Sequence, residues 1–106
     1  MALNSSQLAT VVADTPTDLV TCSAGNTLIV IGLTICNTGA GNATINLDQT
    51  DASNVLLGAI IDDYSLAASQ TLFIDTKFVL AATQKLRFTS NSTDLSVCVT
   101  YDESAV

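Results

Sequence analysis

The side chains of this sequence that could do chemistry are carboxylates and thiols, because the chain has ten acidic residues and three cysteines but no histidine. Without histidine, the Ser-His-Asp and Cys-His arrangements of nucleophilic catalysis are excluded, as are most zinc hydrolase sites. Neither usual form of glycine-rich phosphate loop is present in the sequence. We therefore expect a protein that is not an enzyme, with no catalytic residue and no cofactor.

Five aspartates deserve a test as a cation site: Asp48, Asp51, Asp62, Asp63 and Asp75. Calcium needs several oxygen ligands that converge at about 2.3–2.6 Å, and loops that carry aspartate can supply them. The sequence has no EF-hand pattern, however, and adjacent residues of an extended chain, such as Asp62 and Asp63, point in opposite directions. Aspartate is also a common turn residue. We therefore predict no metal site.

The three cysteines, Cys22, Cys36 and Cys98, do not form the pattern of a disulfide framework or of a zinc site. Their number is odd, and a structural zinc site needs four close ligands. We interpret them as small apolar residues of the core or of a sheet. One disulfide between two strands stays open as an alternative, because sequence spacing does not give the distance between sulfur atoms.

All three basic residues, Lys77, Lys85 and Arg87, lie in one short stretch of the chain. Basic residues on the exposed side of a strand protect a sheet edge from pairing with other chains. They can also form the positive half of a contact with an acidic patch on a neighbouring chain. On this second interpretation Lys77, Lys85 and Arg87 are candidate protein-interface residues, while the first interpretation stays open.

These residues are expected on short strands. Apolar and polar residues alternate with a period of two in several segments, and turn residues separate the segments at intervals of about 8–12 residues. In residues 27–37, Ile29, Ile31, Leu33 and Ile35 share one face, which we expect in the core. The eight expected strands are 8–13, 19–22, 27–37, 43–49, 55–61, 70–75, 85–90 and 94–101.

The predicted fold is all-β, an antiparallel β-sandwich or jelly-roll-like barrel of about eight short strands. It forms a single domain over residues 1–106, with a flexible N-terminal arm at about 1–6 and an acidic C-terminal tail at about 102–106. Residues 27–37 and 43–49 are expected to pair as a β-hairpin, because only a short turn with two glycines separates them.

The surface expected for this chain is poor in charge. Charged residues make up 12% of the sequence, against about 25% in a typical soluble domain, while 48% of residues are hydrophobic and the mean hydropathy is +0.47. A sheet surface rich in threonine and serine is one explanation. The other, which the low charge favours, is that part of the surface lies against other subunits.

The net charge of −7 argues against nucleic acid and anionic membranes as partners, because both are bound by clusters of lysine and arginine. The longest apolar stretch, 28–36, is much shorter than the about 20 residues of a transmembrane helix. The first residues have neither the basic nor the apolar region of a secretory signal. We therefore expect synthesis in a cytoplasm and no contact with nucleic acid or membrane.

Two stretches of the sequence resemble segments of small virion structural proteins of tailed bacteriophages. Residues 25–39, GNTLIVIGLTICNTG, followed by 43–47, ATINL, resemble a hairpin of those proteins. Residues 74–80, IDTKFVL, followed by 84–90, QKLRFTS, resemble the module that comes next. The sequence departs from the pattern at residues 82–83, Ala-Thr, where a glycine turn is expected.

The resemblance implies a β-sandwich displayed on a virus particle. It favours a capsid decoration or cement protein that binds the outside of a phage head and stabilises the shell. The alternative is a tail or fibre component that acts as a binding module for a host-surface ligand. The implied partners are other copies of the chain, in a homotrimer, and the major capsid protein or another virion protein. The implied location is the virion, after assembly in the host cytoplasm.

Overall fold

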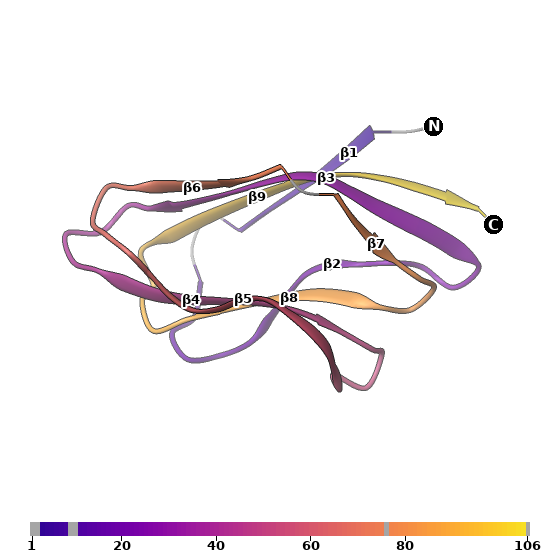
Figure 1. The fold of residues 1–106 in the computed structure, drawn as a ribbon, viewed down its shortest axis with the longest axis horizontal. Helices are drawn as coiled ribbons and strands as arrows, with labels where there is room; N and C mark the ends of the chain where they lie inside the picture. Colours follow the sequence, from indigo (N-terminus) through magenta and orange to yellow (C-terminus); the bar gives the residue numbers. More distant parts are fainter. Residues whose placement is uncertain (1–2, 9–10, 76, 106) are drawn as a thin grey trace.

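The fold consists of two antiparallel sheets that pack face to face, as Figure 1 shows for the computed structural model. The structure describes residues 3–8, 11–75 and 77–105. All regular structure in these ranges is strand, so they hold no helix able to cross a membrane. The prediction of an all-β antiparallel sandwich is confirmed. The strands are β1 (Leu3–Leu8), β2 (Thr17–Thr21), β3 (Asn26–Asn37), β4 (Ala43–Thr50), β5 (Leu56–Leu66), β6 (Thr71–Ile74), β7 (Phe78–Leu80), β8 (Lys85–Ser90) and β9 (Leu95–Ala105).

The chain passes back and forth between the two sheets. The five-stranded sheet has the order β1-β9-β3-β6, with β7 also paired to β3, and the four-stranded sheet has the order β2-β8-β4-β5. β3 and β4 therefore belong to different sheets. The predicted hairpin of residues 27–37 and 43–49 is wrong, because the turn between them is an arch from one sheet to the other.

The β3–β4 arch is stabilised by a buried asparagine. Asn37 is 1% exposed, and its Nδ2 donates to Gly41 O at 2.9 Å and to Leu66 O at 3.0 Å. Its Oδ1 accepts a hydrogen bond from Gly39 N at 3.0 Å. Gly39 lies so close to the β8–β9 turn that a Cβ atom on it would be 2.9 Å from the Cβ of Asp94. The arch therefore has no room for a side chain at this position.

The core lies between the sheets and is formed by alternating inward side chains. On β8, Leu86 and Phe88 are buried, whereas Lys85 and Arg87 lie on the outer face. β9 starts with the same alternation. The alternation predicted for residues 85–90 and 94–101 is thus confirmed. The largest fully buried apolar side chains are Phe88, Leu28, Ile35, Ile45, Leu47, Leu80, Leu86, Leu95, Val30, Val97 and Val99.

A bulge in β3 changes which of its faces points inward. The register of β3 with β9 shifts between Val30 and Gly32, which leaves Ile31 as the extra residue. Before the bulge Val30 is buried and Ile29 is 37% exposed, while Ile35 beyond it is buried. The prediction that the isoleucines of this strand share one core face is therefore wrong for the part before the bulge.

Strands occupy both ends of the described chain. Residues 3–6, expected in a flexible arm, belong to β1, which pairs with β9. Of the expected strand 8–13, residues 9–10 lie outside the described residues, and 11–13 are not in a strand. Residues 102–105, expected in a tail, continue β9 beside β3. The sequence at both ends lacks the apolar alternation because neither residues 3–8 nor residues 101–105 place a fully buried side chain in the core, although their backbone is paired.

Glu103 connects the end of β9 to the β2–β3 turn through two hydrogen bonds. Its Oε2 accepts hydrogen bonds from Asn26 Nδ2 at 2.8 Å and from Ser23 N at 2.9 Å. The Asn26 side chain, followed by the Ser23 backbone, holds the pKa of Glu103 below its ordinary value. An acidic side chain near the end of the chain is thus part of the fold.

The cysteines occupy three different environments, and all three are free thiols: Cys22 is buried, Cys36 half-buried and Cys98 exposed. No cross-strand disulfide joins any two of them. Burial, and then the charge of Glu103, raise the pKa of the Cys22 thiol. The interpretation as core or sheet residues holds for Cys22 in the core and for Cys36 and Cys98 in the five-stranded sheet.

The turn between β7 and β8 has a left-handed residue where a glycine was expected. Gln84 N donates to Ala81 O at 3.0 Å, and Thr83 N donates to Cys22 O at 2.9 Å. Thr83 has a φ of 70°, which is rare for a β-branched residue. A positive φ at the third residue of a turn is the geometry that glycine normally supplies. The structure thus gives a physical reason for expecting glycine at residues 82–83.

Replacing Thr83 by glycine should therefore stabilise the protein, by about 0.5–1 kcal/mol after the entropy cost of glycine in the unfolded chain is subtracted. Urea unfolding of both proteins measures the difference. Thr89→Gly, on the regular strand β8, is the matched control and should lower the free energy of unfolding by about 1 kcal/mol. A Thr83→Gly protein less stable than the wild type would contradict the explanation.

Candidate protein interface

Lys85 and Arg87 lie together on the outer face of the four-stranded sheet, where both pair with Asp18. Arg87 Nε is 2.8 Å from Asp18 Oδ1, and Lys85 Nζ is 3.3 Å from Asp18 Oδ2. The register explains this, since Asp18 on β2 lies directly opposite Arg87 on β8. Arg87 Nη2 also donates to Pro16 O, and Lys85 Nζ to Asn54 Oδ1. Both cations are thus bound within their own chain, in surface pairs that contribute at most about 1 kcal/mol each.

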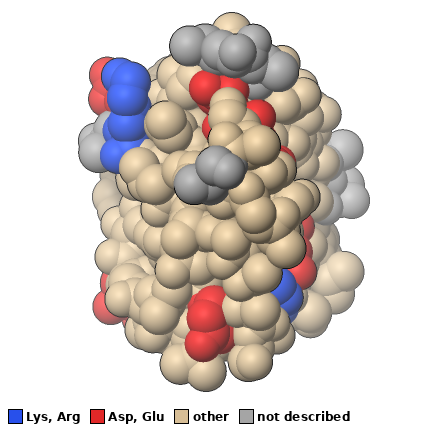
Figure 2. Space-filling view, turned by 90° about the vertical axis from the view of Figure 1, so that its right-hand side faces the viewer, with Lys and Arg blue, Asp and Glu red and all other residues tan. Residues whose placement is uncertain are grey.

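Lys77 lies apart from this cluster. It is exposed, in the segment between β6 and β7 of the five-stranded sheet. The described part of the chain offers it no ion pair. Figure 2 likewise shows the basic atoms of one face in two separate places. The structure therefore brings together two of the three candidate interface residues and leaves Lys77 as the cation that an acidic group of another chain can reach.

Of the aspartates considered for a cation site, Asp51 lies in a turn, whereas Asp48 lies on β4 and the adjacent Asp62 and Asp63 lie on β5. Asp51 Oδ1 accepts hydrogen bonds from Ser53 N at 2.8 Å and from Val55 N at 2.9 Å, which is the turn role expected from the sequence. Burial, and then the charge of Asp62, raise the pKa of Asp48. Among residues 3–8, 11–75 and 77–105, no three His, Cys, Asp or Glu side chains lie close enough together to hold a metal ion.

The outer face of the five-stranded sheet exposes apolar side chains of three strands in one row, with Asp102 of β9 between two of them, and a fourth apolar side chain, Phe73, outside this row. Leu3 on β1 pairs with Asp102 on β9, Asp102 with Ile29 on β3, and Ile29 with Val79 on β7. Leu3, Ile29 and Val79 are 64%, 37% and 56% exposed. Phe73 on β6 is 74% exposed. We call Leu3, Ile29, Phe73 and Val79 the apolar face, and exposed apolar residues gathered on one surface are typical of a contact site.

A shallow hollow of about 280 Å³ lies beside Phe73 on the apolar face. In the register, Thr34 on β3 pairs with Phe73 on one side and with Cys98 on the other. Gly32 and Thr100, which pair with each other, also line the hollow. Apart from Asp75, the residues that line the hollow beside the exposed ring are uncharged, and an apolar side chain of a partner has room to pack there.

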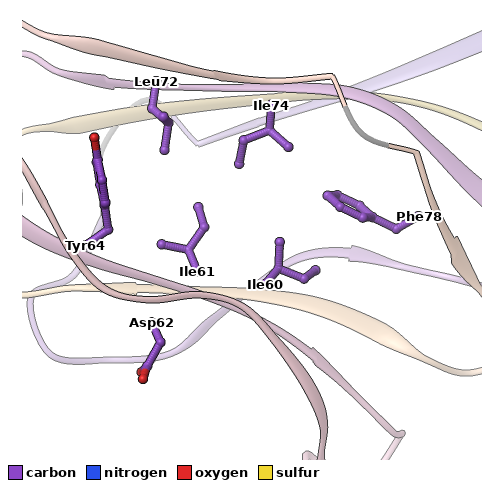
Figure 3. Close-up of a pocket in the computed structure, with 7 residues that line it drawn as sticks. All are labelled: Ile60, Ile61, Asp62, Tyr64, Leu72, Ile74 and Phe78. Atoms are coloured by element: carbon purple, nitrogen blue, oxygen red, sulfur yellow. The ribbon is translucent and has the colours of Figure 1, made fainter.

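A larger groove of about 530 Å³ opens along one side of the sandwich, and we call it the side groove. It lies between β5, at the edge of the four-stranded sheet, and β6 and β7 of the five-stranded sheet. Figure 3 shows Ile60 and Ile61 of β5 pointing toward Leu72 and Ile74 of β6, while Asp62 points away. Its walls are thus mainly aliphatic. The remaining lining residues are Tyr64 and Phe78.

The side groove exists because the two sheets meet directly on one side only. On the other side β1 and β2 are joined by a hydrogen bond from Ser6 Oγ to Leu19 O at 3.0 Å. On the groove side, the register of β5 with β4 shifts three times between Ile45 and Thr50. The expected break of the strand after residue 61 is replaced by these bulges, and β5 continues to Leu66.

Three consecutive exposed apolar residues, the last before β5 and the first two of β5, form what we call the β5 tip. Val55, Leu56 and Leu57 are 58%, 57% and 51% exposed. They follow the turn that the Asp51 carboxylate holds through its hydrogen bond from Val55 N. Figure 1 shows this end of the β4–β5 hairpin projecting away from the sandwich. The tip therefore presents apolar side chains without cover from its own chain.

Sequence patterns do not predict the side groove or the apolar face. The groove brings residues 60–61 together with 72–78, and the distance between these segments depends on how the sheets stack. The run of apolar residues at 55–57 is a signal for the tip, because a half-buried strand would alternate there. The apolar pattern by itself predicts only one apolar strand over residues 55–61.

Comparisons with known proteins give only distant likenesses. No family model matches the chain, and no curated protein matches it. Two crystal structures of a pentameric capsid protein isolated from metagenomic phage sequences align with TM-scores of 0.44 and 16% identity, over 94% of this chain and 63% and 62% of the other. The structure of infectious bursal disease virus Gt strain aligns with a TM-score of 0.44 and 13% identity, over 93% of this chain and 30% of the other. The chain spans less than two thirds of each of these proteins.

Proposed function

We propose that the chain is a structural subunit of a virus particle, and specifically a decoration protein that binds the outside of a phage head and stabilises the shell. The viral part of the proposal is supported by the sequence resemblance of residues 25–47 and 74–90 to phage virion proteins. The structural part is supported by the apolar face. Together they favour a protein whose role is to bind other proteins.

The proposed contact with the shell rests on one observation, the apolar face. It combines the most exposed large apolar side chain among the described residues, Phe73, with Leu3, Ile29 and Val79 on one sheet. The opposite outer face, in contrast, carries the charge cluster of Asp18, whose partners are Lys85 and Arg87. A sandwich that exposes four large apolar side chains on one outer face and a charge cluster on the other suits a protein that lies on a shell with the charge cluster toward water.

In this role the protein stabilises the shell through the summed binding energy of many copies. Each subunit buries a modest surface, and linked copies hold the shell with an avidity that a single contact does not reach. We propose that the copies form a homotrimer, since a symmetric oligomer presents several apolar faces to the shell at once. Light scattering on the purified protein should then give a mass three times the 11.0 kDa of the chain.

Heads that lack this chain are expected to release their DNA at a lower temperature than complete heads, because the stabilising contacts are missing. Adding the purified wild-type protein should restore the release temperature. Phe73→Asp should restore it much less, because a charge would be buried at the centre of the contact. Thr89→Asp, on the outer face of the four-stranded sheet, is the matched control and should restore it fully.

Unchanged heat resistance of heads without the chain would contradict the decoration role. If such particles also failed to adsorb to host cells, the alternative of a tail or fibre component that binds a host-surface ligand would replace it. The two measurements use the same particles, so they separate the two functions directly.

A further inference from the structure

We propose that the β5 tip of one copy of this chain binds in the side groove of a second copy. This goes beyond the proposed function, because it names the contact between copies and holds for the isolated protein. The occupant is the segment Val55, Leu56 and Leu57, and its site is the groove between β5 and β6.

The tip and the groove match in size and in chemistry. The groove has a volume of about 530 Å³, within the range of about 300–1,000 Å³ in which proteins hold small apolar ligands. Its walls include Ile60, Ile61 and Leu72, so a polar occupant would lose its hydrogen bonds to water there. The three side chains of the tip are aliphatic and more than half exposed, so their burial is favourable.

A chain cannot fill its own groove with its own tip. Leu57 and Ile60 lie on the same strand, three residues apart, which is about 10 Å in an extended chain. β5 is paired with β4 from Thr50↔Leu56 to Ala43↔Leu66, so the tip cannot turn back over the groove. A tip that binds in the groove therefore comes from another chain, and a second copy supplies the same tip.

One charge beside the groove, that of Lys77, is complementary to the charge of Asp51 beside the tip, whereas Asp62, which lines the groove, is acidic. Asp51 lies in the turn that leads to the tip. Lys77 comes directly before Phe78, which lines the groove, and it is exposed. The chain has a net charge of −7, and its other two cations, Lys85 and Arg87, are bound to Asp18. A contact between copies therefore has one free cation in the described chain to offset acidic repulsion, and that cation lies beside the groove.

The contact joins two different surfaces, so it is heterologous. Each copy offers a tip to one neighbour and a groove to another, and such contacts close into a ring when the rotation between copies fits. A ring of three copies would be the homotrimer proposed above. The apolar face takes no part in the contact: Phe73 lies between the groove residues Leu72 and Ile74 on β6 but points to the outer side.

The test measures self-association of purified protein by sedimentation over a dilution series. Val55→Asp at the tip, and Ile60→Trp, which fills the groove with a larger apolar side chain, should each raise the dissociation constant by about 30-fold or more. Val12→Asp changes a valine of similar exposure, 64%, outside the contact, and should leave it unchanged. Phe73→Asp on the apolar face should also leave it unchanged. Circular dichroism verifies that each variant is folded.

A mixing experiment shows whether tip and groove bind each other. Val55→Asp keeps an open groove and Ile60→Trp keeps an intact tip, so an equal mixture should form 1:1 pairs although each variant alone is monomeric. The proposal is overturned if the wild type stays monomeric at about 1 mM, if Val55→Asp associates like the wild type, or if the mixture forms no pairs. None of these results bears on the heat resistance of heads, which tests the proposed function separately.

Discussion

Replacing Phe88 by alanine should lower the free energy of unfolding by about 3–5 kcal/mol, the largest loss that we expect from a single substitution in this protein. Phe88 is 1% exposed and lies on β8, between Thr17 of β2 and Leu47 of β4 in the register. Alanine would remove a whole ring from the space between the sheets and leave a cavity. Since domains of this size are stable by only about 5–15 kcal/mol, the variant should unfold at a much lower urea concentration.

Phe73→Ala is the matched control, because it makes the same chemical change on a residue that is 74% exposed. Its cost should stay below about 1 kcal/mol in the isolated chain, since no core space is emptied. Equal losses for the two variants would show that the core does not lie where the structure places Phe88.

Replacing Asn37 by leucine should cost about 2–4 kcal/mol, although leucine is apolar and the site is buried. The asparagine side chain makes three hydrogen bonds, to Gly41 O, to Leu66 O and from Gly39 N. Leucine would leave these backbone groups without the partner that the arch supplies, and the Leu66 carbonyl is buried. Urea unfolding gives the loss directly.

Asn37→Asp tests whether hydrogen bonds or packing carry this effect, because aspartate has the shape of asparagine. It should also be destabilising near neutral pH, since a carboxylate cannot donate to Gly41 O or Leu66 O. Part of the loss should be recovered as the pH falls toward about 4, because burial beside two carbonyl oxygens raises the pKa of the new acid and its protonated form can donate one hydrogen bond. Asn42→Leu, at an exposed position of the same arch, should change stability by less than about 0.5 kcal/mol. An Asn37→Leu protein as stable as the wild type would contradict the role of the buried amide.

Strands with one apolar face and one polar face are predictable from the sequence. Residues 85–90 alternate apolar and polar side chains, and β8 has this order because one face meets the core and the other meets water. The alternation fails in β3, where both faces are apolar. There the bulge at Ile31 decides which face points inward, and no apolar pattern marks the position of the bulge.

Which strands pair is not predictable from the same pattern. A strand has one apolar face both when it pairs beside its neighbour and when it faces that neighbour across a sandwich. The short turn after β3 therefore suggested a hairpin, whereas the structure has an arch. The signal that separates the two is Asn37, a polar residue at the end of an apolar strand whose amide bonds stabilise the arch.

The positions of the candidate interface residues are likewise predictable from the sequence only in part. Lys85 and Arg87 are two positions apart on one strand, so their common face follows from the sequence. Lys77 lies near them in the sequence, but the turn at residues 81–84 takes the chain to the other sheet. Asp18, which binds both Lys85 and Arg87, is far away in the sequence and is brought to them only by the β2–β8 pairing.

The sequence by itself determined that this chain folds into antiparallel strands around an apolar core and that its surface is poor in charge, because composition and period-two alternation are local properties. Only the tertiary structure decided which sheet each strand joins, and with it the apolar face and the charge cluster of Asp18. It also decided that the β5 side of the sandwich stays open. These features depend on contacts between segments far apart in the chain. Their positions follow from which strand edges and side chains have no partner once the two sheets have packed together.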